Sequence, residues 1–69
     1  MNITLNGNEK SIDKDQLTVT ELLAHENVDM PEMVSVEYNG DILDRDQFAT
    51  TNVKEGDKVE FLYFMGGGA

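Results

Sequence analysis

Apolar and polar residues alternate at the start of the chain, with the period of two that is typical of a half-buried β-strand. Three apolar residues lie on one face of this predicted strand: Met1, Ile3 and Leu5. Residues 6–8, Asn-Gly-Asn, predict a turn, and residues 9–13 then pair back as a second strand with Ile12 facing inward. The chain is therefore expected to open with a β-hairpin.

A helix is predicted to follow this hairpin. Thr18 and Glu21 have capping-box spacing, in which each side chain bonds a free amide at the helix start. The apolar stripe of the helix is Val19, Leu22 and Leu23. The helix is expected to end near Asn27, because Pro31 prevents a long extension.

Short extended segments dominate the second half of the chain. The predicted elements are a strand over residues 33–38, a hairpin turn at 39–40, a return strand at 42–43, a polar or helical turn at 44–48 anchored by Phe48, an extended piece at 50–53 and a turn at 54–57. Segments with strand-like alternation therefore precede and follow one predicted helix. This order favours an α+β domain with a mixed sheet of four to five strands packed on one main helix.

The last predicted strand becomes apolar on both faces. One face carries Val59, Phe61 and Tyr63. Leu62 and Phe64 lie on the other face, and a strand with two apolar faces is covered on both sides or awaits a partner. We predict that Leu62 and Phe64 bind a partner; the alternative is that they pack beneath residues 44–48.

The chain ends in Met65 followed by Gly66, Gly67, Gly68 and Ala69. We expect a globular domain over residues 1–64 and a flexible tail over 65–69. A slim tail carrying a main-chain carboxyl group can enter a narrow enzyme site where larger residues would collide. The tail is therefore a candidate reactive group.

Length and charge exclude several classes of function. The chain has 69 residues, one histidine and no cysteine, so it forms one small domain without thiolate chemistry of its own. Its net charge of −9 opposes binding to nucleic acids and anionic membranes, and favours solubility, steering toward basic partners, or both. No segment is apolar enough to span a membrane, and a cytoplasmic location is expected.

Other candidate sites are weak in this sequence. His25 has no second histidine or cysteine with which to bind zinc, so we expect it on the helix surface and predict no metal site. The aspartates of the 41–46 loop lack the remaining EF-hand ligands: Asp41, Asp44 and Asp46. Met30 and Met33 are expected to anchor their loop under the core, which leaves Met65 as the methionine tied to function.

Five segments in this order resemble the ubiquitin-like β-grasp sulfur carriers of the ThiS/MoaD family. They are residues 1–7, 18–23, 36–40, 55–60 and the glycine-containing end. The resemblance covers essentially the whole chain and is closest to the carriers of thiamine biosynthesis. It implies a β-grasp fold and a protein substrate rather than an enzyme.

The resemblance also implies the partners and the chemistry. An E1-like adenylating enzyme of ThiF type, using its own ATP and Mg, would activate the terminal glycine, and a sulfur donor would convert it to a thiocarboxylate. A ThiG-type thiazole synthase would accept the sulfur, and the carrier itself would bind no cofactor stably. The reactive positions carried over are Gly67 and Gly68, with Gly66 possible, and the expected docking residues are Leu62, Phe64 and Met65.

One departure concerns the last residue, because family members end in Gly-Gly whereas Ala69 follows Gly68 here. Three explanations stay open: a peptidase removes Ala69, the adenylating partner tolerates its methyl group, or Ala69 comes from expression of the protein. The alternative functions are a MoaD-like carrier feeding molybdopterin synthesis and a ubiquitin-like interaction module that is never activated.

Overall fold

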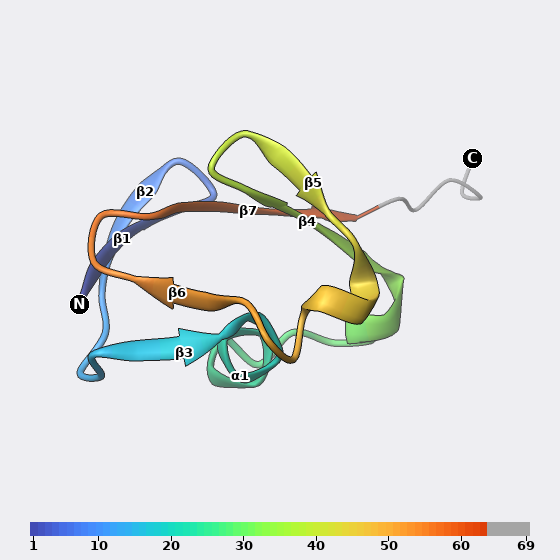
Figure 1. Ribbon diagram of the computed structural model, residues 1–69, viewed down its shortest axis with the longest axis horizontal. Helices are drawn as coiled ribbons and strands as arrows, with labels where there is room; N and C mark the ends of the chain where they lie inside the picture. The colour runs from blue at the N-terminus through green and yellow to red at the C-terminus, as the bar shows by residue number, and fades with distance from the viewer. Residues whose placement is uncertain (64–69) are drawn as a thin grey trace.

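The structure is a computed structural model that describes residues 1–63 (Figure 1). The elements are β1 (Asn2–Leu5), β2 (Asn8–Ser11), β3 (Gln16–Thr18), α1 (Val19–His25), η1 (Pro31–Met33), β4 (Val34–Tyr38), β5 (Asp41–Leu43), η2 (Arg45–Gln47), β6 (Asn52–Lys54) and β7 (Lys58–Tyr63). The η elements are single 3₁₀ turns. Within these residues no helix is long and apolar enough to cross a membrane.

Five strands form a mixed sheet in the order β2-β1-β7-β4-β5. Strands β1 and β7 run parallel, and every other neighbouring pair is antiparallel. The first strand and the last described strand are therefore central neighbours, and α1 lies across one face (Figure 1). This arrangement confirms the predicted β-grasp fold.

Two residues of left-handed backbone make each hairpin turn. Asn6 and Gly7 have φ values of 52° and 84°, and Asn39 and Gly40 have 51° and 94°. Positive φ at both central residues defines the type I′ turn, whose twist matches that of the flanking strands. The Asn-Gly pairs therefore fix both hairpins, as predicted.

The helix begins with the predicted capping box. The Glu21 amide donates to Thr18 Oγ1 at 3.1 Å, and the Thr18 amide donates to the Glu21 carboxylate at 2.9 Å. Two further helix amides, those of Val19 and Thr20, donate to carbonyl groups of the segment that follows η2. The helix start is thus fastened both locally and to the second half of the chain.

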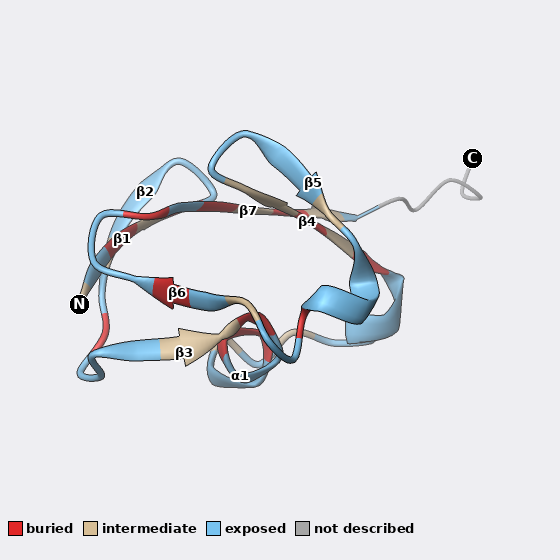
Figure 2. Ribbon diagram, in the orientation of Figure 1, coloured by how far each residue is buried: buried red, intermediate tan, exposed pale blue. Residues whose placement is uncertain are grey.

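The core lies between α1 and the inner face of the sheet, where the buried positions gather (Figure 2). Its members are Ile3, Leu5, Ile12, Val19, Leu22, Leu23, Val34, Val36, Phe48, Val53, Val59 and Phe61. Each fully buried aliphatic side chain of this kind contributes about 1.5–3 kcal/mol relative to an exposed one. The predicted helix stripe belongs to it, as do most of the predicted inward residues of the strands; Met1 only packs against it, and Tyr63 lies outside it.

Three features differ from the sequence predictions. Strand β3 was not predicted; it pairs with β6 as a separate two-stranded sheet. Met30 and Met33 do not anchor their loop under the core, because 60% and 53% of their surfaces are exposed. Tyr63, placed with Val59 and Phe61 on the inner face, is 49% exposed because it lies at the end of the strand, beyond the core.

Candidate functional site

The chain leaves the described domain from the end of β7, the central strand of the sheet. Tyr63, its last residue, pairs with Val34 at the start of β4. On the other side, the parallel pairing with β1 extends only to Leu5 opposite Val59. Within residues 1–63, the end of β7 therefore has one strand neighbour instead of two, which leaves an open corner of the sheet beside Tyr63.

This corner exposes part of the β7 backbone. The Asn6 amide donates to the Val59 carbonyl, and the side chain of Asn6 accepts from the Phe61 amide at 2.8 Å. Because strand groups alternate in direction, the Phe61 carbonyl and the Tyr63 amide point to the same side. Within residues 1–63, the strand pairing on this side of β7 ends at Leu5 opposite Val59, short of these two groups.

A groove of about 420 Å³ lies beside this open edge. Phe61 and Tyr63 line it from β7, and the loop after α1 lines it from the opposite side with residues 27–29. Glu26 and Asp29 make part of its wall acidic. The root of the tail thus lies at a recess that carries both main-chain groups and carboxylates.

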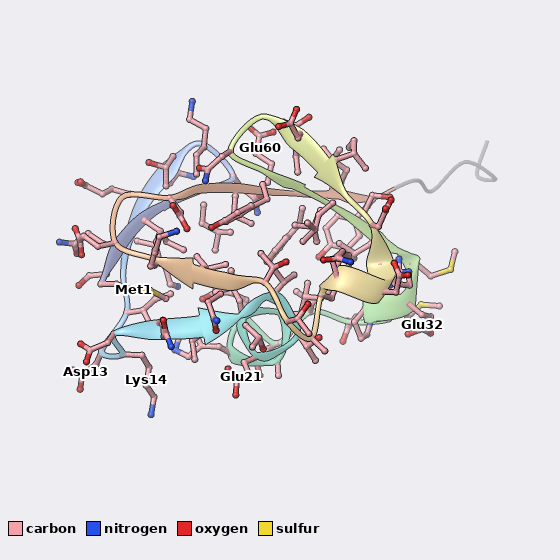
Figure 3. The ribbon with its side chains drawn as sticks, viewed as in Figure 1. Met1, Asp13, Lys14, Glu21, Glu32 and Glu60 are labelled. Carbon is pink, nitrogen blue, oxygen red and sulfur yellow. The ribbon has the colours of Figure 1, made fainter. Side chains whose placement is uncertain are left out.

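The outer face of the sheet mixes apolar and acidic side chains. Leu62 is half-buried there and pairs with Ser35, while Glu60 pairs with Glu37. Ile42, 60% exposed, lies on the other side of Glu37. Figure 3 shows Glu60 on the side of the sheet away from α1. Leu62 thus lies on a free surface rather than in the core, the position that its predicted docking role requires.

Like charges that face each other across two strands repel each other and destabilise the pair. Glu37 and Glu60 are such a pair. A partner that brings an arginine or lysine between the two carboxylates would relieve this repulsion. The outer face is therefore suited to a partner surface that combines apolar and basic side chains.

One polar cluster near the opposite end of β7 was missed in the sequence. The carboxylate of Asp57, buried in its turn, accepts hydrogen bonds from Tyr38 Oη at 2.6 Å, the Lys54 amide at 3.0 Å and Asn39 Nδ2 at 3.3 Å. Desolvation opposes ionisation of this carboxyl group, but the three donors outweigh it and hold the pKa of Asp57 below its usual value.

The same contact acts in the opposite direction on the phenol. Burial raises the pKa of Tyr38, and the hydrogen bond to Asp57 raises it further. Both groups therefore keep their neutral-pH forms, carboxylate and phenol. The cluster joins β4, β6 and the turn before β7, and we assign it a structural role. Its signal in the sequence was the aspartate after Gly56, which ends a turn at the start of an apolar strand.

The remaining candidates lie on the surface. His25 Nδ1 is 3.0 Å from a carboxylate oxygen of Glu26, which also pairs with Lys10 at 3.2 Å. The three aspartates of the 41–46 loop are exposed: Asp41, Asp44 and Asp46. Within residues 1–63, no three histidine, cysteine or acidic side chains lie close enough together to hold a metal ion.

Six residues of the candidate site lie outside the described part of the chain: Phe64, Met65, Gly66, Gly67, Gly68 and Ala69. The predicted domain boundary at residue 64 and the predicted roles of these residues therefore stay predictions. Leu62, by contrast, lies on the described outer face of the sheet. The described site consists of the open end of β7, its groove and this outer face.

A helix packed on a mixed sheet, with parallel first and last strands at its centre, defines the ubiquitin-like β-grasp class. The chain belongs to the ThiS family, whose model matches residues 2–68. Members of this family are small sulfur carriers rather than enzymes.

Solved structures agree with this assignment. The crystal structure of the thiamine biosynthesis protein ThiS from Geobacter metallireducens is 53% identical, with a TM-score of 0.91 over 97% of this chain and 99% of that one. A solution NMR structure of a thiamine biosynthesis protein from the same organism is also 53% identical, with a TM-score of 0.83 over 100% of this chain and 90% of that one.

A curated relative connects the chain to a larger protein. The thiazole synthase of Paramagnetospirillum magneticum is 36% identical over all 69 residues of this chain. The chain spans 21% of the length of that relative. A segment similar to this chain is therefore part of a polypeptide named for thiazole synthesis.

Proposed function

We propose that this protein carries sulfur as a C-terminal thiocarboxylate and donates it to the thiazole ring during thiamine biosynthesis. The observation that carries the proposal is the family match, which includes all three glycines of the tail and ends at Gly68. The 53% identity to a thiamine biosynthesis protein supports the choice of pathway.

The first step is adenylation of the terminal glycine by an E1-like, ThiF-type enzyme that binds ATP and Mg. A terminal carboxyl group has a pKa of about 3.3–3.7 and is ionised at neutral pH. Its oxygen attacks the α-phosphorus of ATP, a new O–P bond forms and pyrophosphate leaves. The product is an acyl-adenylate, a mixed anhydride with an electrophilic carbonyl carbon.

The second step places sulfur on that carbon. Hydrosulfide, supplied by a donor system, attacks the acyl carbon; a C–S bond forms, AMP leaves with the electron pair of the broken C–O bond, and the new thioacid loses its proton. Gly67 and Gly68 suit both steps, because a backbone without Cβ atoms can be held extended close to the nucleotide. The resulting thiocarboxylate is the sulfur donor for the acceptor enzyme.

The proposed acceptor is a thiazole synthase of ThiG type. The curated relative joins a segment like this chain to a polypeptide named thiazole synthase, which places carrier and acceptor at high effective concentration. This linkage favours thiazole formation over a MoaD-like role in pterin synthesis. It also favours a carrier over an interaction module that is never activated.

Two features of the chain fit the proposed handling of its end. The family match stops before Ala69, which supports Gly68 as the reactive residue and a peptidase that removes the alanine. The outer face offers Leu62, continued by Phe64 and Met65 in the sequence, as the docking strip for the partner enzymes. The domain thus positions the tail, and its partners perform the chemistry.

The test compares three forms of the chain that end at Ala69, at Gly68 and at Gly67. Each is incubated with the adenylating enzyme of the same organism and ATP, and pyrophosphate release is measured. A sulfur donor is then added and the intact mass is read for exchange of oxygen by sulfur. The form ending at Gly68 is expected to be activated and sulfurated, and the shorter form to be folded but inert.

The alternative function, an interaction module that is never activated, makes a different prediction. In that case the form without Gly68 and Ala69 binds its partner as tightly as the full chain does. If no form releases pyrophosphate or gains sulfur while circular dichroism shows a folded domain, the carrier function is wrong. Activation of the Ala69 form alone would show instead that the alanine is part of the reactive end.

A further inference from the structure

Four residues other than glycine adopt left-handed backbone in the described part of the chain. Three of them are asparagine: Asn6, Asn27 and Asn39, with φ values of 52°, 55° and 51°. The fourth is Met30, with φ 53°. Asparagine tolerates this conformation, whereas a long side chain pays a steric cost of about 1–2 kcal/mol. The sequence thus places a disfavoured residue at this one position.

The surrounding structure holds Met30 in this conformation. The Met33 amide donates to the Met30 carbonyl at 2.8 Å, which closes η1. Arg45 donates to the carbonyl of Pro31 at 3.2 Å and to that of Val34 at 2.7 Å, and its guanidinium lies 5.1 Å from the centre of the Phe48 ring. An arginine from η2 therefore fixes both ends of the turn.

The methionines gain no burial from this arrangement. Met30 is 60% exposed and Met33 is 53% exposed, and they account for two of the four large apolar side chains exposed within residues 1–63. Strain that is maintained by other contacts is more typical of functional positions than of structural ones. Met30 and Met33 are therefore exposed to solvent on a turn whose left-handed residue is strained and which other contacts of the fold stabilise.

The turn lies at the end of the molecule from which the tail departs. Val34, directly after Met33, pairs with Tyr63, and the loop that leads into Met30 forms one wall of the groove beside Tyr63. In Figure 3, Glu32 of this turn lies at the opposite end of the domain from Asp13. Tyr63 is itself 49% exposed, so this end of the domain carries three exposed apolar side chains: Met30, Met33 and Tyr63.

The length of the tail limits how far away the partner can be. Five residues separate Tyr63 from Gly68 inclusive of the glycine, and at 3.3–3.6 Å per residue they reach at most about 18 Å. An enzyme that adenylates Gly68 must bring its catalytic atoms within that distance of Tyr63. Its surface must therefore come close to the end of the domain at which Met30, Met33 and Tyr63 are exposed.

We propose that Met30 and Met33 form a docking surface for the adenylating enzyme, at the entrance to its active site. The enzyme surface at this entrance is apolar and flanked by basic residues. The proposal rests on the function proposed above. Asp29 and Glu32, next to the two methionines, supply the acidic flank that a basic partner surface complements. Methionine suits the contact because its unbranched, polarizable side chain adapts to an irregular surface.

The test uses the full chain ending at Gly68 and measures KM and kcat for pyrophosphate release by the adenylating enzyme. Met30→Asn removes the apolar side chain and installs the residue that the backbone favours, so the thermal midpoint is expected to stay or rise. KM is expected to increase about tenfold with kcat little changed, which corresponds to an interface contact of ordinary strength. Met33→Ser, which leaves the left-handed residue intact, is expected to raise KM in the same way.

A charge pair provides the matched control. Glu32→Lys and Asp13→Lys change the net charge equally, but only Glu32 lies at the tail end. The first is expected to raise KM severalfold more than the second. An unchanged KM in Met30→Asn and Met33→Ser, with normal activation of the parent chain, would overturn the docking surface alone. No activation of the parent chain would overturn the proposed function and the docking surface together.

Discussion

The phenolic oxygen of Tyr38 lies 2.6 Å from a carboxylate oxygen of Asp57, a residue 19 positions later in the sequence. Asp57→Ala would leave the Lys54 amide and the Asn39 side chain without their acceptor, and would leave the Tyr38 hydroxyl only the Asn52 carbonyl, 3.2 Å away. A loss of about 2–4 kcal/mol in the free energy of unfolding is expected, because unsatisfied polar groups are costly. Urea denaturation followed by circular dichroism measures it.

Tyr38→Phe provides the matched comparison, since it removes one donor and keeps the ring. The expected loss is about 1 kcal/mol, smaller than that of Asp57→Ala. Equal losses in the two variants would show that the carboxylate makes no essential contact besides the one with the phenol. A double-mutant cycle then gives the coupling energy of the pair.

Acid should weaken the domain partly through Asp57. Its pKa is lower in the folded than in the unfolded state, so its contribution is present above the unfolded pKa and is lost as the pH falls through the folded pKa. Asp57→Asn, which does not titrate, should therefore show a shallower decline in stability between about pH 5 and pH 2. Urea midpoints measured across this range for both proteins check it; parallel curves would contradict it.

The tail should matter for chemistry and not for folding. Gly67→Trp is expected to block activation, because a large side chain cannot pass through a channel shaped for glycine. The thermal midpoint should change by less than about 1 °C, as for surface substitutions away from packed structure. Pyrophosphate release and differential scanning calorimetry measure the two effects. A large loss of stability would show that the predicted boundary at residue 64 is wrong.

A charge on the outer face should weaken partner binding. Leu62→Asp places a third carboxylate beside Glu37 and Glu60, and Phe64→Asp does the same at the next outward position of the sequence pattern. Either is expected to raise the Kd for the adenylating enzyme at least about tenfold. Asn8→Asp, exposed on β2, adds the same charge elsewhere and should have little effect. The Kd of each variant is measured by calorimetric titration. Equal Kd values for all three variants would show that Leu62 and Phe64 have no docking role.

Local chemistry made much of the fold predictable. The Asn-Gly turns at residues 6–7 and 39–40 fix both hairpins, and the pair Thr18 and Glu21 fixes the helix start. Each of these signals lies within four residues and depends on local geometry: left-handed backbone in the turns, and hydrogen bonds between side chain and backbone in the capping box. The final assembly of strands then follows from which faces are apolar.

The misses required information from distant parts of the chain. Strand β3 has three residues and forms by pairing with β6, more than thirty positions later in the chain. Three residues are too few for an alternation of apolar and polar positions to predict a strand. From the sequence, Asp57 is predicted only as a turn residue, because its hydrogen bond to Tyr38 depends on the tertiary fold. Met30 is predicted from the sequence to pack under the core, whereas in the structure it is exposed on a turn that Arg45 stabilises through hydrogen bonds.

The placement of β7 between two strands has a mechanical consequence. A partner that grips the tail pulls along the axis of β7, so the load is shared at once by the bonds to β1 and β4 instead of opening them one after another. Stretching single molecules between residue 2 and the tail should therefore give a high rupture force. The carrier can be drawn into a catalytic site by its end without being unravelled.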